Sequence, residues 1–406
     1  MVSVSGQGPL AGLRVVEIAS LAPAPFACTV LSDLGAEVLR IDRAPASPSG
    51  SAPSGSAASA GDPLSRGRLS VAVDLKHPGA AETVLRLVER ADVFVEGFRP
   101  GVCERLGIGP EPCLARNPRL VYARMTGYGQ DGPMAQRAGH DINYLSLAGA
   151  LEPLGPASGP PLPPLNFLAD FGGGGMLLVV GVLAALWERE RSGIGQVVDA
   201  AMVEGTALIT SVLHTLRGAG LWEERRGRNL FDGSAPFYAA YECSDGRFVA
   251  VGALEPQFWA ELLDGLGLPD AAELVERQLD RDSWAADQAR LAAIFRTRTR
   301  DEWAAQFAES NGCLTPVLGP FEAHEHPHNV ARGTFVVVEA EVDGELRTQP
   351  GPAPRFSRTP GRIGSPVSFL GGDGDGSGDG DGDKALGEWG LSSEDLGELR
   401  ADGVFG

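Results

Sequence analysis

The sequence predicts an α/β protein in which a large, Rossmann-like domain with a doubly wound parallel sheet is joined to a smaller α+β domain. Short apolar runs alternate with helical stretches through residues 13–209, and a hairpin pattern replaces this alternation after residue 225. Of the 406 residues, 43% are apolar and 21% are charged, which are values of a folded globular chain. The length accommodates more than one domain.

The alternation begins with an apolar run at Leu13–Ile18, a helical stretch around Phe26–Leu34 and a second run at Glu37–Ile41, which together predict a βαβ unit. Further strands and helices are expected at Ser70–Asp74, Gly79–Arg90, Val93–Glu96, Leu120–Met125, Met176–Arg191 and Gly195–Met202, with another helix near Glu204. Such alternation indicates a parallel sheet covered by helices on both faces. We assign residues 1–224 to this large domain and expect ligands at the carboxyl ends of its strands.

Residues 225–330 are expected to form the small α+β domain. A hairpin is predicted from Tyr238–Cys243 and Arg247–Val251, because Ser244-Asp-Gly246 between them is a strong turn signal. Helices are expected at Gln257–Leu266, Trp284–Phe295 and Arg300–Glu309. Residues 331–370, with strands at Phe335–Val342 and Leu346–Gln349, are expected to return to the large domain.

Two segments have the composition of flexible linkers. Residues 45–62 are rich in Ser, Ala, Pro and Gly, and residues 371–383 alternate Gly with Asp. A calcium-binding repeat is the alternative for the second segment, but the apolar position of each such repeat is missing. Residues 384–406 are expected to be a helical segment that packs on the large domain.

Charge and apolar patterning exclude several classes of protein. The net charge of −19 has the wrong sign for binding nucleic acid or an anionic membrane. The apolar run Met176–Trp187 has about 12 residues, whereas a membrane span needs about 20, and residues 1–10 do not resemble a signal peptide. The five scattered cysteines are expected to be reduced. We expect a cytoplasmic protein with no membrane partner.

Cofactor motifs are missing at the expected positions. The first strand is followed by Ala19-Ser-Leu-Ala-Pro-Ala-Pro25 rather than GxGxxG, and the sequence contains no Walker-type GxxxxGK. Nicotinamide, flavin and nucleoside triphosphate chemistry are therefore disfavoured. His324, His326 and His328 alternate on an expected loop and lack a second set of ligands, so no metal site is expected.

Three positions could carry chemistry. His140 follows a Gly-rich loop after a predicted strand, where a catalytic imidazole is well placed, although a structural histidine is the alternative. Asp170 precedes four glycines before an apolar helix; it is either a helix cap or part of a site where free N–H groups stabilise an oxyanion. Glu255, just before Pro256 at the start of a helix, is either a capping residue or a catalytic partner.

The chain resembles the family III CoA-transferases of the CaiB/BaiF type and, within them, the α-methylacyl-CoA racemase branch. The resemblance covers residues 10–370 and returns at residues 385–404, which match the usual family ending. The segments that carry it are Pro9–Glu17, Leu34–Asp42, Asp74-Leu-Lys76, Asp92–Val102, Thr126–Gln130, Gly139-His140-Asp141 and Ala169-Asp170.

This resemblance implies a catalytic set of His140, Asp170 and Glu255. The aspartate that matches Asp170 is a nucleophile in the transferases, whereas the racemases add a histidine and a glutamate at the positions of His140 and Glu255. The racemases interconvert (2R)- and (2S)-2-methylacyl-CoA by a two-base 1,1-proton transfer through an enolate, and the glutamate orients or stabilises the histidine. A CoA transferase that forms an aspartyl-CoA thioester at Asp170, and a non-catalytic acyl-CoA-binding protein, are the alternatives.

The chemistry of α-proton removal agrees with this set. The C–H group beside a thioester is a very weak acid. Removal of its α-proton therefore needs a positioned base and stabilisation of the enolate oxygen. We expect His140 and Asp170 on opposite faces of the α-carbon, and backbone N–H groups of Gly172 and Gly173 at the thioester oxygen. No cofactor and no metal are expected, since CoA is part of the substrate.

The phosphates of CoA require a local cluster of basic residues in this acidic chain. Candidates at or after predicted strand ends are Arg40, Arg43, Arg99 and Arg105. By resemblance, the other residues of the CoA site are Ala72, Asp74, Lys76, Glu96, Gly97 and Tyr144. The resemblance also implies an interlocked homodimer, in which Glu255 acts on the partner's active site.

Overall fold

The computed structural model describes residues 8–43, 62–268, 270–339, 346–364, 368–370 and 380–405. Of the two expected linkers, residues 45–61 and 371–379 lie outside the described residues. The chain divides into two compact units, the first formed by residues 1–148, 165–209 and 327–406, and the second by residues 149–164 and 210–326.

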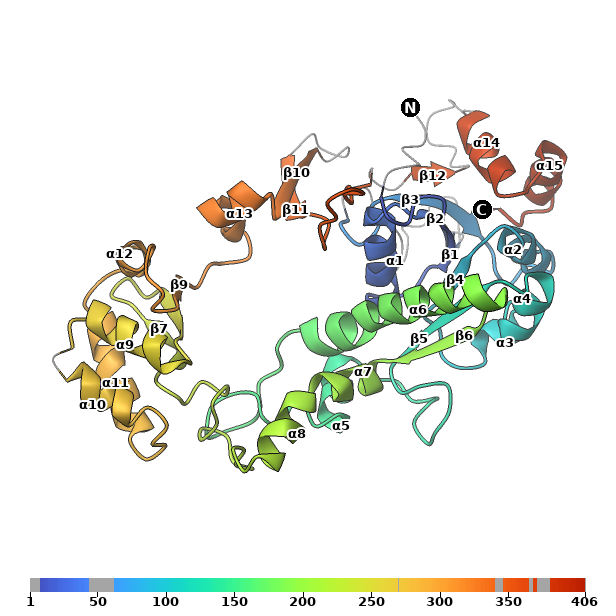
Figure 1. Cartoon of the computed structure of the whole chain (residues 1–406). Helices are drawn as coiled ribbons and strands as arrows, with labels where there is room; N and C mark the ends of the chain where they lie inside the picture. Colours follow the sequence, from blue (N-terminus) through green and yellow to red (C-terminus); the bar gives the residue numbers. More distant parts are fainter. Residues whose placement is uncertain are drawn as a thin grey trace. The chain divides into compact units, whose positions relative to one another are not determined.

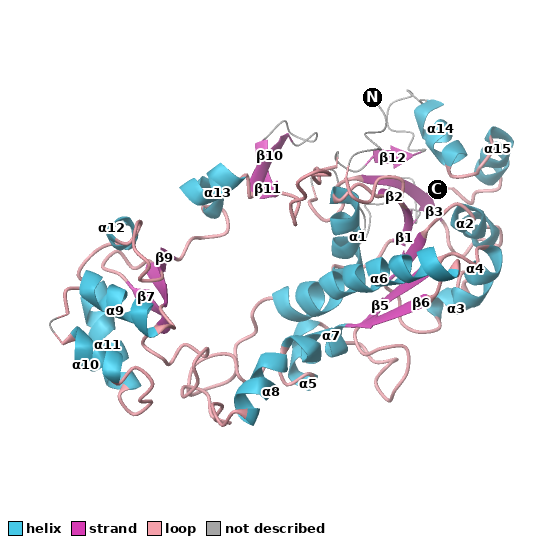
Figure 2. Cartoon of the chain, viewed as in Figure 1, coloured by secondary structure: helices cyan, strands magenta, loops and turns pink. Residues whose placement is uncertain are grey.

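The first unit is built on a parallel sheet of seven strands in the order β12-β3-β2-β1-β4-β5-β6 (Figures 1 and 2). The strands are β1 (Arg14–Ile18), β2 (Glu37–Arg43), β3 (Arg68–Val73), β4 (Val93–Glu96), β5 (Val121–Thr126), β6 (Val197–Ala201) and β12 (Ser368–Leu370). The order 3-2-1-4-5-6 within it is that of a Rossmann fold. The predicted α/β fold class is therefore confirmed.

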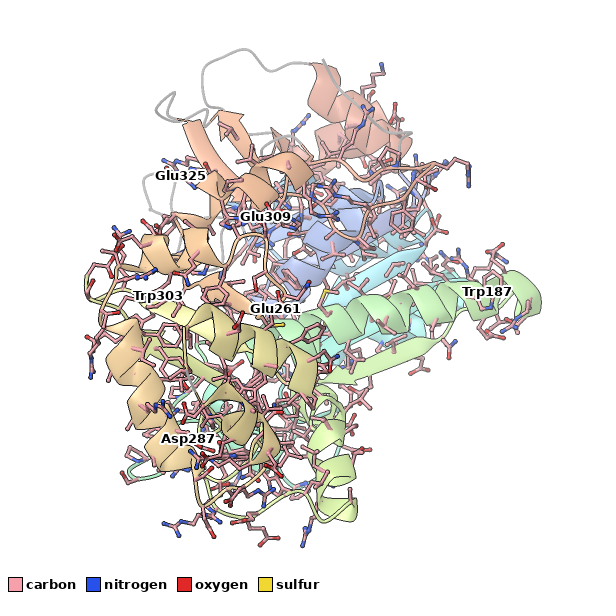
Figure 3. All side chains as sticks on the ribbon, turned by 60° about the vertical axis from the view of Figure 1, so that its left-hand side comes forward. Trp187, Glu261, Asp287, Trp303, Glu309 and Glu325 are labelled. Carbon is pink, nitrogen blue, oxygen red and sulfur yellow. The ribbon has the colours of Figure 1, made fainter. Side chains whose placement is uncertain are left out.

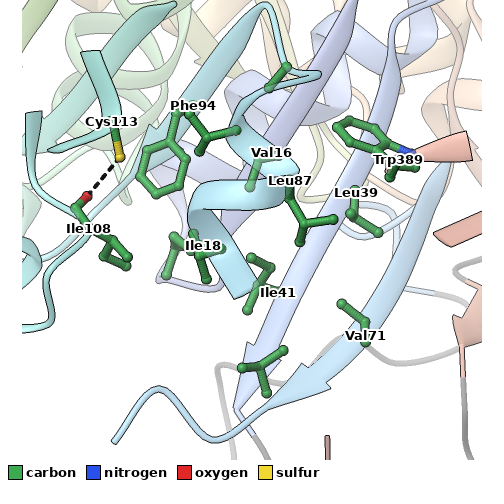
Figure 4. Packing of buried hydrophobic residues seen from close by; sticks show 14 of the residues in the cluster. Val16, Ile18, Leu39, Ile41, Val71, Leu87, Phe94, Ile108, Cys113 and Trp389 are labelled. Carbon is green, nitrogen blue, oxygen red and sulfur yellow. Dashed lines mark hydrogen bonds between the residues drawn. The ribbon is translucent and has the colours of Figure 1, made fainter. Parts of the chain in front are cut away.

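Helices cover both faces of this sheet (Figure 1). On one face lie α1 (Pro23–Asp33), the π-helix η1 (Phe167–Met176) and α6 (Leu177–Ser192); on the other lie α2 (Ala80–Val88), α3 (Val102–Arg105) and α4 (Pro110–Arg116). The core under α2 to α4 is made by alternate strand residues such as Val16, Leu39 and Phe94 (Figure 4). Alternation within the strands thus assigns each side chain to one of two helical layers.

The C-terminal helices α14 (Gly380–Glu388) and α15 (Ser393–Ala401) belong to the same core. Leu386, Trp389 and Leu396 are buried in the cluster that contains Leu39 and Leu87 (Figure 4). The end of the chain adds backbone pairing, because Asp74 N donates to Val404 O at 3.0 Å. Since α14 begins at Gly380, it includes residues 380–383, which the sequence pattern had assigned to the linker.

The long apolar helix begins earlier than expected. The sequence predicts a helix from Met176, whereas the structure is helical from Phe167, with ten π-helical residues before α6. The glycines lie inside the helix because it packs backbone to backbone on α7 (Met202–Ile209): a Cβ atom added at Gly205 would lie 1.8 Å from the Gly173 carbonyl oxygen. The glycine run therefore permits close packing of the two helices. The sequence pattern places these glycines before the helix and so does not predict this packing.

Within the described residues, Phe167–Ser192 is one helix that by length and composition could cross a membrane, and 39% of its most apolar window is buried. Its contacts with α1, α7, β5 and β6 are those of a core helix. Length and composition alone do not separate a core helix from a membrane span.

The second unit contains an antiparallel sheet of β7 (Tyr238–Glu242), β8 (Phe248–Gly252) and β9 (Leu314–Pro316). Its helices are α8 (Ser211–Gly218), α9 (Pro256–Gly265), α10 (Ala271–Glu276), α11 (Trp284–Phe295), α12 (Arg300–Gln306) and the short 3₁₀ helix η2 (Ala323–Glu325). Residues 149–164 join this unit, in which Arg226 donates to the carbonyls of Leu154 and Gly159 at 3.2 and 2.8 Å. The division therefore differs from the expected range of 225–330.

The remaining elements lie in the first unit and comprise α13 (Pro327–Arg332) and the hairpin of β10 (Phe335–Glu339) and β11 (Leu346–Pro350). Arg66 connects the hairpin to α1: its guanidinium donates to Gln349 Oε1 and Pro350 O and pairs with Asp33. His328 lies in α13 and His324 in η2, rather than on one loop. Among the described residues, no group of three His, Cys, Asp or Glu side chains could hold a metal ion.

Candidate active site

The candidate site forms where the helix α5 (Asp141–Leu147) meets η1. His140 is the N-cap residue of α5, which follows β5 and a Gly-rich loop, and its backbone N–H donates to Asn143 Oδ1 at 3.0 Å. The side chain of His140 is exposed. The helix start therefore fixes the backbone at this residue while the imidazole remains accessible.

The imidazole of His140 has a defined orientation. Its Nδ1 lies 2.6 Å from the carbonyl oxygen of Gly139. Because a carbonyl only accepts hydrogen bonds, Nδ1 is the donor, and the neutral ring has its free lone pair on Nε2. The phenol of Tyr144 donates to the same carbonyl at 2.5 Å and packs against the ring of Tyr128. Burial raises the pKa of Tyr144 to about 12, so this phenol stays a donor.

Asp141 joins α5 to η1. Its side chain is 5% exposed, and its Oδ2 accepts hydrogen bonds from the backbone N–H groups of Ala169 and Asp170 at 2.8 and 2.9 Å. These N–H groups belong to the first turn of η1, where a π-helix has no internal acceptor for them. The residue that follows His140 thus binds the backbone of Asp170 itself.

The carboxyl of Asp170 is half-buried and accepts a hydrogen bond from Asn166 Nδ2 at 3.3 Å. Burial raises its pKa, and the negative charge of Asp141 raises it further, while the Asn166 hydrogen bond and the charge of His140 lower it. Asn166, rather than Asp170, occupies the N-cap position of η1. The simple capping role for Asp170 is therefore wrong, because this residue lies within the helix, four residues after the N-cap.

The structure therefore brings two of the three expected catalytic side chains, His140 and Asp170, to one place. Glu255 lies in the second unit, exposed, at the N-cap of α9. Its carbonyl accepts the N–H groups of Phe258 and Trp259, and its side chain makes no capping hydrogen bond. Its action on His140 stays a prediction.

Gly172 and Gly173 lie inside η1. A π-helix pairs each N–H with the carbonyl five residues earlier. Gly173 is also buried against α7, where an added Cβ would lie 2.6 Å from Thr206 N. An oxyanion role for these two N–H groups stays a prediction, and it would compete with the hydrogen bonds of the helix.

A second feature lies at the carboxyl ends of β1 and β4, where the strand order reverses and Rossmann-like sheets bind their ligands. Ser20 follows β1 and Gly97 follows β4, and a Cβ added to Gly97 would lie 2.7 Å from Ser20 Oγ. Within the described residues, the buried Ser20 Oγ has no hydrogen-bond partner. Sequence reasoning missed Ser20, because a serine after a strand has no distinctive motif.

Two of the expected CoA-binding residues are buried in ion pairs. Arg40 is 2% exposed and pairs with Glu17 at 2.8 Å and Asp42 at 3.0 Å. Glu96 is fully buried, pairs with Arg124 at 2.9 Å and accepts the backbone N–H of Phe98 at 2.7 Å. A phosphate contact of Arg40 would therefore compete with two carboxylates.

Most of the other expected CoA residues lie at or after the ends of β2, β3 and β4, with Arg105 in α3 and Tyr144 in α5. Exposed side chains are those of Arg43, Asp74, Lys76, Arg99 and Arg105, while Ala72 and Gly97 are partly exposed and Tyr144 is buried beside His140. Asp74 Oδ1 accepts the Lys76 N–H at 3.0 Å, which forms the turn after β3. Because parallel strands end at one edge, Arg43, Lys76 and Arg99 share the edge that carries the switch point.

Residues 10–373 match the model of CoA-transferase family III. The chain is 44% identical to an alpha-methylacyl-CoA racemase of Mus musculus over 97% of each chain. It is 42% identical to an alpha-methylacyl-CoA racemase of Homo sapiens, covering 98% of this chain and 97% of that protein. A solved CaiB/BaiF family protein from Brucella suis superposes with a TM-score of 0.76 at 25% identity, covering 95% of this chain and 100% of that one. The chain belongs to CoA-transferase family III.

Proposed function

We propose that this protein is a racemase that interconverts (2R)- and (2S)-2-methylacyl-CoA thioesters. The observation that carries the proposal is the link between the two bases: His140 is the N-cap residue of α5, and the next residue, Asp141, accepts the backbone N–H of Asp170. Racemisation needs one group that removes the α-proton and another that returns a proton to the opposite face. The extensive similarity to enzymes named alpha-methylacyl-CoA racemase supports the same activity.

The imidazole of His140 is suited to one of these roles. With Nδ1 donating to the Gly139 carbonyl, Nε2 is the atom that takes the α-proton. The imidazolium that forms keeps the same Nδ1 hydrogen bond, so the ring need not turn during the reaction. In the reverse direction Nε2–H returns the proton to the enolate.

The carboxyl of Asp170 is suited to the opposite role. Its pKa is raised by burial and by Asp141, so its carboxylate is a stronger base than an exposed aspartate. The protonated carboxyl is correspondingly more accessible near neutral pH, which the return of a proton requires. The proposed reaction uses the CoA thioester as substrate and needs no other cofactor.

Binding of the CoA portion is proposed at the carboxyl edge of the sheet. Exposed basic side chains at or after the ends of β2, β3 and β4, which include Arg43, Lys76 and Arg99, supply positive charge for the phosphates. Gly97 and the hydroxyl of Ser20, which has no hydrogen-bond partner in the part of the chain that the structure describes, lie at the switch point of the same edge. This placement leaves the thioester to reach His140, which follows β5.

We also propose a homodimer that covers the apolar face of the helix Phe167–Ser192. Phe167, Met176, Val180 and Trp187 on it are 60%, 44%, 57% and 70% exposed, and Trp187 is labelled on α6 in Figure 3. Isolated exposed apolar residues are common, but four along one helix favour burial by a partner. In such a dimer, Glu255 of one chain would orient His140 of the other. Sedimentation of the wild-type chain and of Trp187→Glu tests this.

The transferase alternative assigns a different role to Asp170. Its carboxylate would attack the acyl-CoA thioester, which gives an acyl-aspartyl anhydride and free CoA thiolate. The thiolate would then attack the aspartyl carbonyl, so that the carboxylate of the donor acid leaves and an aspartyl-CoA thioester remains. That sequence needs an acceptor acid and does not need His140. The two functions therefore differ in what they require of these residues.

One experiment separates them. The protein is incubated with a single enantiomer of a 2-methylacyl-CoA in deuterated water without an acceptor acid, and α-deuterium and chirality are followed. Exchange with inversion that is lost in His140→Ala and Asp170→Ala supports the racemase. CoA transfer only after a carboxylic acid is added would establish the transferase, and binding without either reaction would leave an acyl-CoA-binding protein.

A further inference from the structure

Asp141 carries more than a capping role. Its carboxylate is buried, with Oδ2 shared by the two N–H groups of η1. Within the described residues, Oδ1 is buried and accepts no hydrogen bond, and Asp141 forms no ion pair. A buried carboxylate without a cation is costly, and such uncompensated groups are found where chemistry needs them.

We infer that Asp141 is a positioning residue of the proton transfer, which holds the backbone of Asp170 against α5 and uses its unpaired charge to make Asp170 more basic. The inference rests on the proposed racemase function for its kinetic consequence. Its structural part depends only on the Asp141 hydrogen bonds to Ala169 and Asp170.

Few charged groups act on Asp170. Among the described residues, those that do are Asp141 and His140, and its other polar neighbours are the Asn166 amide and the Tyr144 phenol. The charged side chains on the other elements packed against η1 are exposed or have other partners: Asp33 on α1, Arg124 on β5, Asp199 on β6, Glu204 on α7, and Glu188, Arg189, Glu190 and Arg191 at the far end of α6. Among the charged groups near Asp170, Asp141 is thus the main one that disfavours its ionisation.

The substitution Asp141→Asn separates charge from geometry. The amide oxygen can accept the same two N–H groups, while the amide nitrogen takes the place of the unpartnered Oδ1. The variant therefore keeps the link between α5 and η1 but lacks the charge. Asp141→Ala removes both.

The first measurement titrates Asp170 directly by infrared spectroscopy. The carboxyl band of protonated Asp170 is identified as the one missing from Asp170→Asn, and its midpoint is followed with pH in the wild type and in Asp141→Asn. We expect the midpoint to move to lower pH in Asp141→Asn. An unchanged midpoint in a folded variant would overturn the inference, and this readout needs no enzymatic activity.

The second measurement follows deuterium exchange against pH from each enantiomer. For the enantiomer that Asp170 deprotonates, the acidic limb is expected to move to lower pH in Asp141→Asn and the plateau to fall about tenfold, because a weaker base abstracts the proton more slowly. Asp141→Ala is expected to lose about a hundredfold through misplacement of Asp170. A plateau loss without a shift of the acidic limb would overturn the charge role.

The control is Asp395→Asn in α15: Asp395 Oδ2 also accepts a backbone N–H, that of Ser392 at 2.8 Å, but its Oδ1 is paired with Arg86 at 2.5 Å. It should leave both Asp170 titrations unchanged. Exchange that is undetectable in the wild type would refute the racemase function, whereas the infrared midpoint would still decide the inference.

Discussion

Two groups of acidic residues in the first unit differ in how their charges are compensated. Under α1, Glu17 accepts hydrogen bonds from Arg40 Nη1 at 2.8 Å and from Arg68 Nε at 3.0 Å. Asp42 accepts one from Arg40 Nε at 3.0 Å. Where α5 meets η1, Asp141 and Asp170 instead accept backbone N–H groups and an asparagine amide. The first arrangement pairs each carboxylate with a buried cation, whereas in the second, burial and the charge of Asp141 raise the pKa of Asp170.

The largest expected effect follows from replacing Asp170, a carboxyl that has no ion-pair partner among the described residues. Asp170→Asn keeps the shape of the side chain but cannot accept a proton, so racemisation should fall about thousandfold. His140→Gln should have a loss of similar size. The rates are measured by chirality of the product, with circular dichroism as the check on folding. Racemisation at wild-type rates in either variant would contradict the assignment of bases.

Removing Glu17, whose carboxylate is paired with buried arginines, should lower the stability of the fold instead. Glu17→Ala leaves the buried guanidinium groups of Arg40 and Arg68 without a shared partner, which should lower the free energy of unfolding by about 3–5 kcal/mol. Glu82→Ala is the control: Glu82 pairs with Arg116 at the surface, and its loss should cost at most about 1 kcal/mol. Equal losses in the two variants, measured by denaturant unfolding, would remove the distinction between buried and exposed pairs.

Disturbing the close packing of η1 on α7 should have a smaller effect, which changes both the stability of the protein and its activity. A Cβ at Gly205 would lie 1.8 Å from the Gly173 carbonyl oxygen, so Gly205→Ala must displace one helix. We expect a loss of about 1–3 kcal/mol in unfolding free energy, together with slower racemisation because Asp170 moves with η1. Denaturant unfolding and the chirality assay measure the two effects.

The control for this substitution is Gly397→Ala in α15, where an added Cβ meets nothing within 4 Å. It should stabilise the protein by up to about 1 kcal/mol through helix propensity alone. If Gly205→Ala behaved like Gly397→Ala, the packing explanation for the glycine run would be wrong.

The smallest expected effect concerns pH and stability. Because the folded protein raises the pKa of Asp170, the folded state binds more protons than the unfolded state in the window above the unfolded pKa, and this residue's contribution to stability falls as pH rises through that window. Asp170→Asn should therefore be slightly more stable than the wild type at neutral pH, and the difference should shrink under acidic conditions. Thermal unfolding at several pH values measures it; an equal difference at every pH would contradict the raised pKa.

Local pattern was sufficient for elements in both units. The strand at Val93–Glu96 in the first unit and the helix at Trp284–Phe295 in the second have the predicted bounds. The position of His140 after a Gly-rich loop made it a candidate, and the family resemblance of the Gly-His-Asp segment implied its catalytic role. These features depend on periodicity and on short motifs, which neighbouring residues express directly. The close packing of the glycine run was not predictable in this way, because it depends on the contact of Gly173 with Gly205 of another helix.

The sequence by itself determined the α/β alternation, the family resemblance and the candidate bases His140 and Asp170. Only the tertiary structure decided which charges are neutralised: it buried Arg40 between Glu17 and Asp42, and it placed the Asp141 carboxylate against the backbone of Asp170, 29 residues away along the chain. The physical reason is that a charged residue has the same local signature wherever it lies, whereas its proton affinity depends on burial and on partners that only folding brings near.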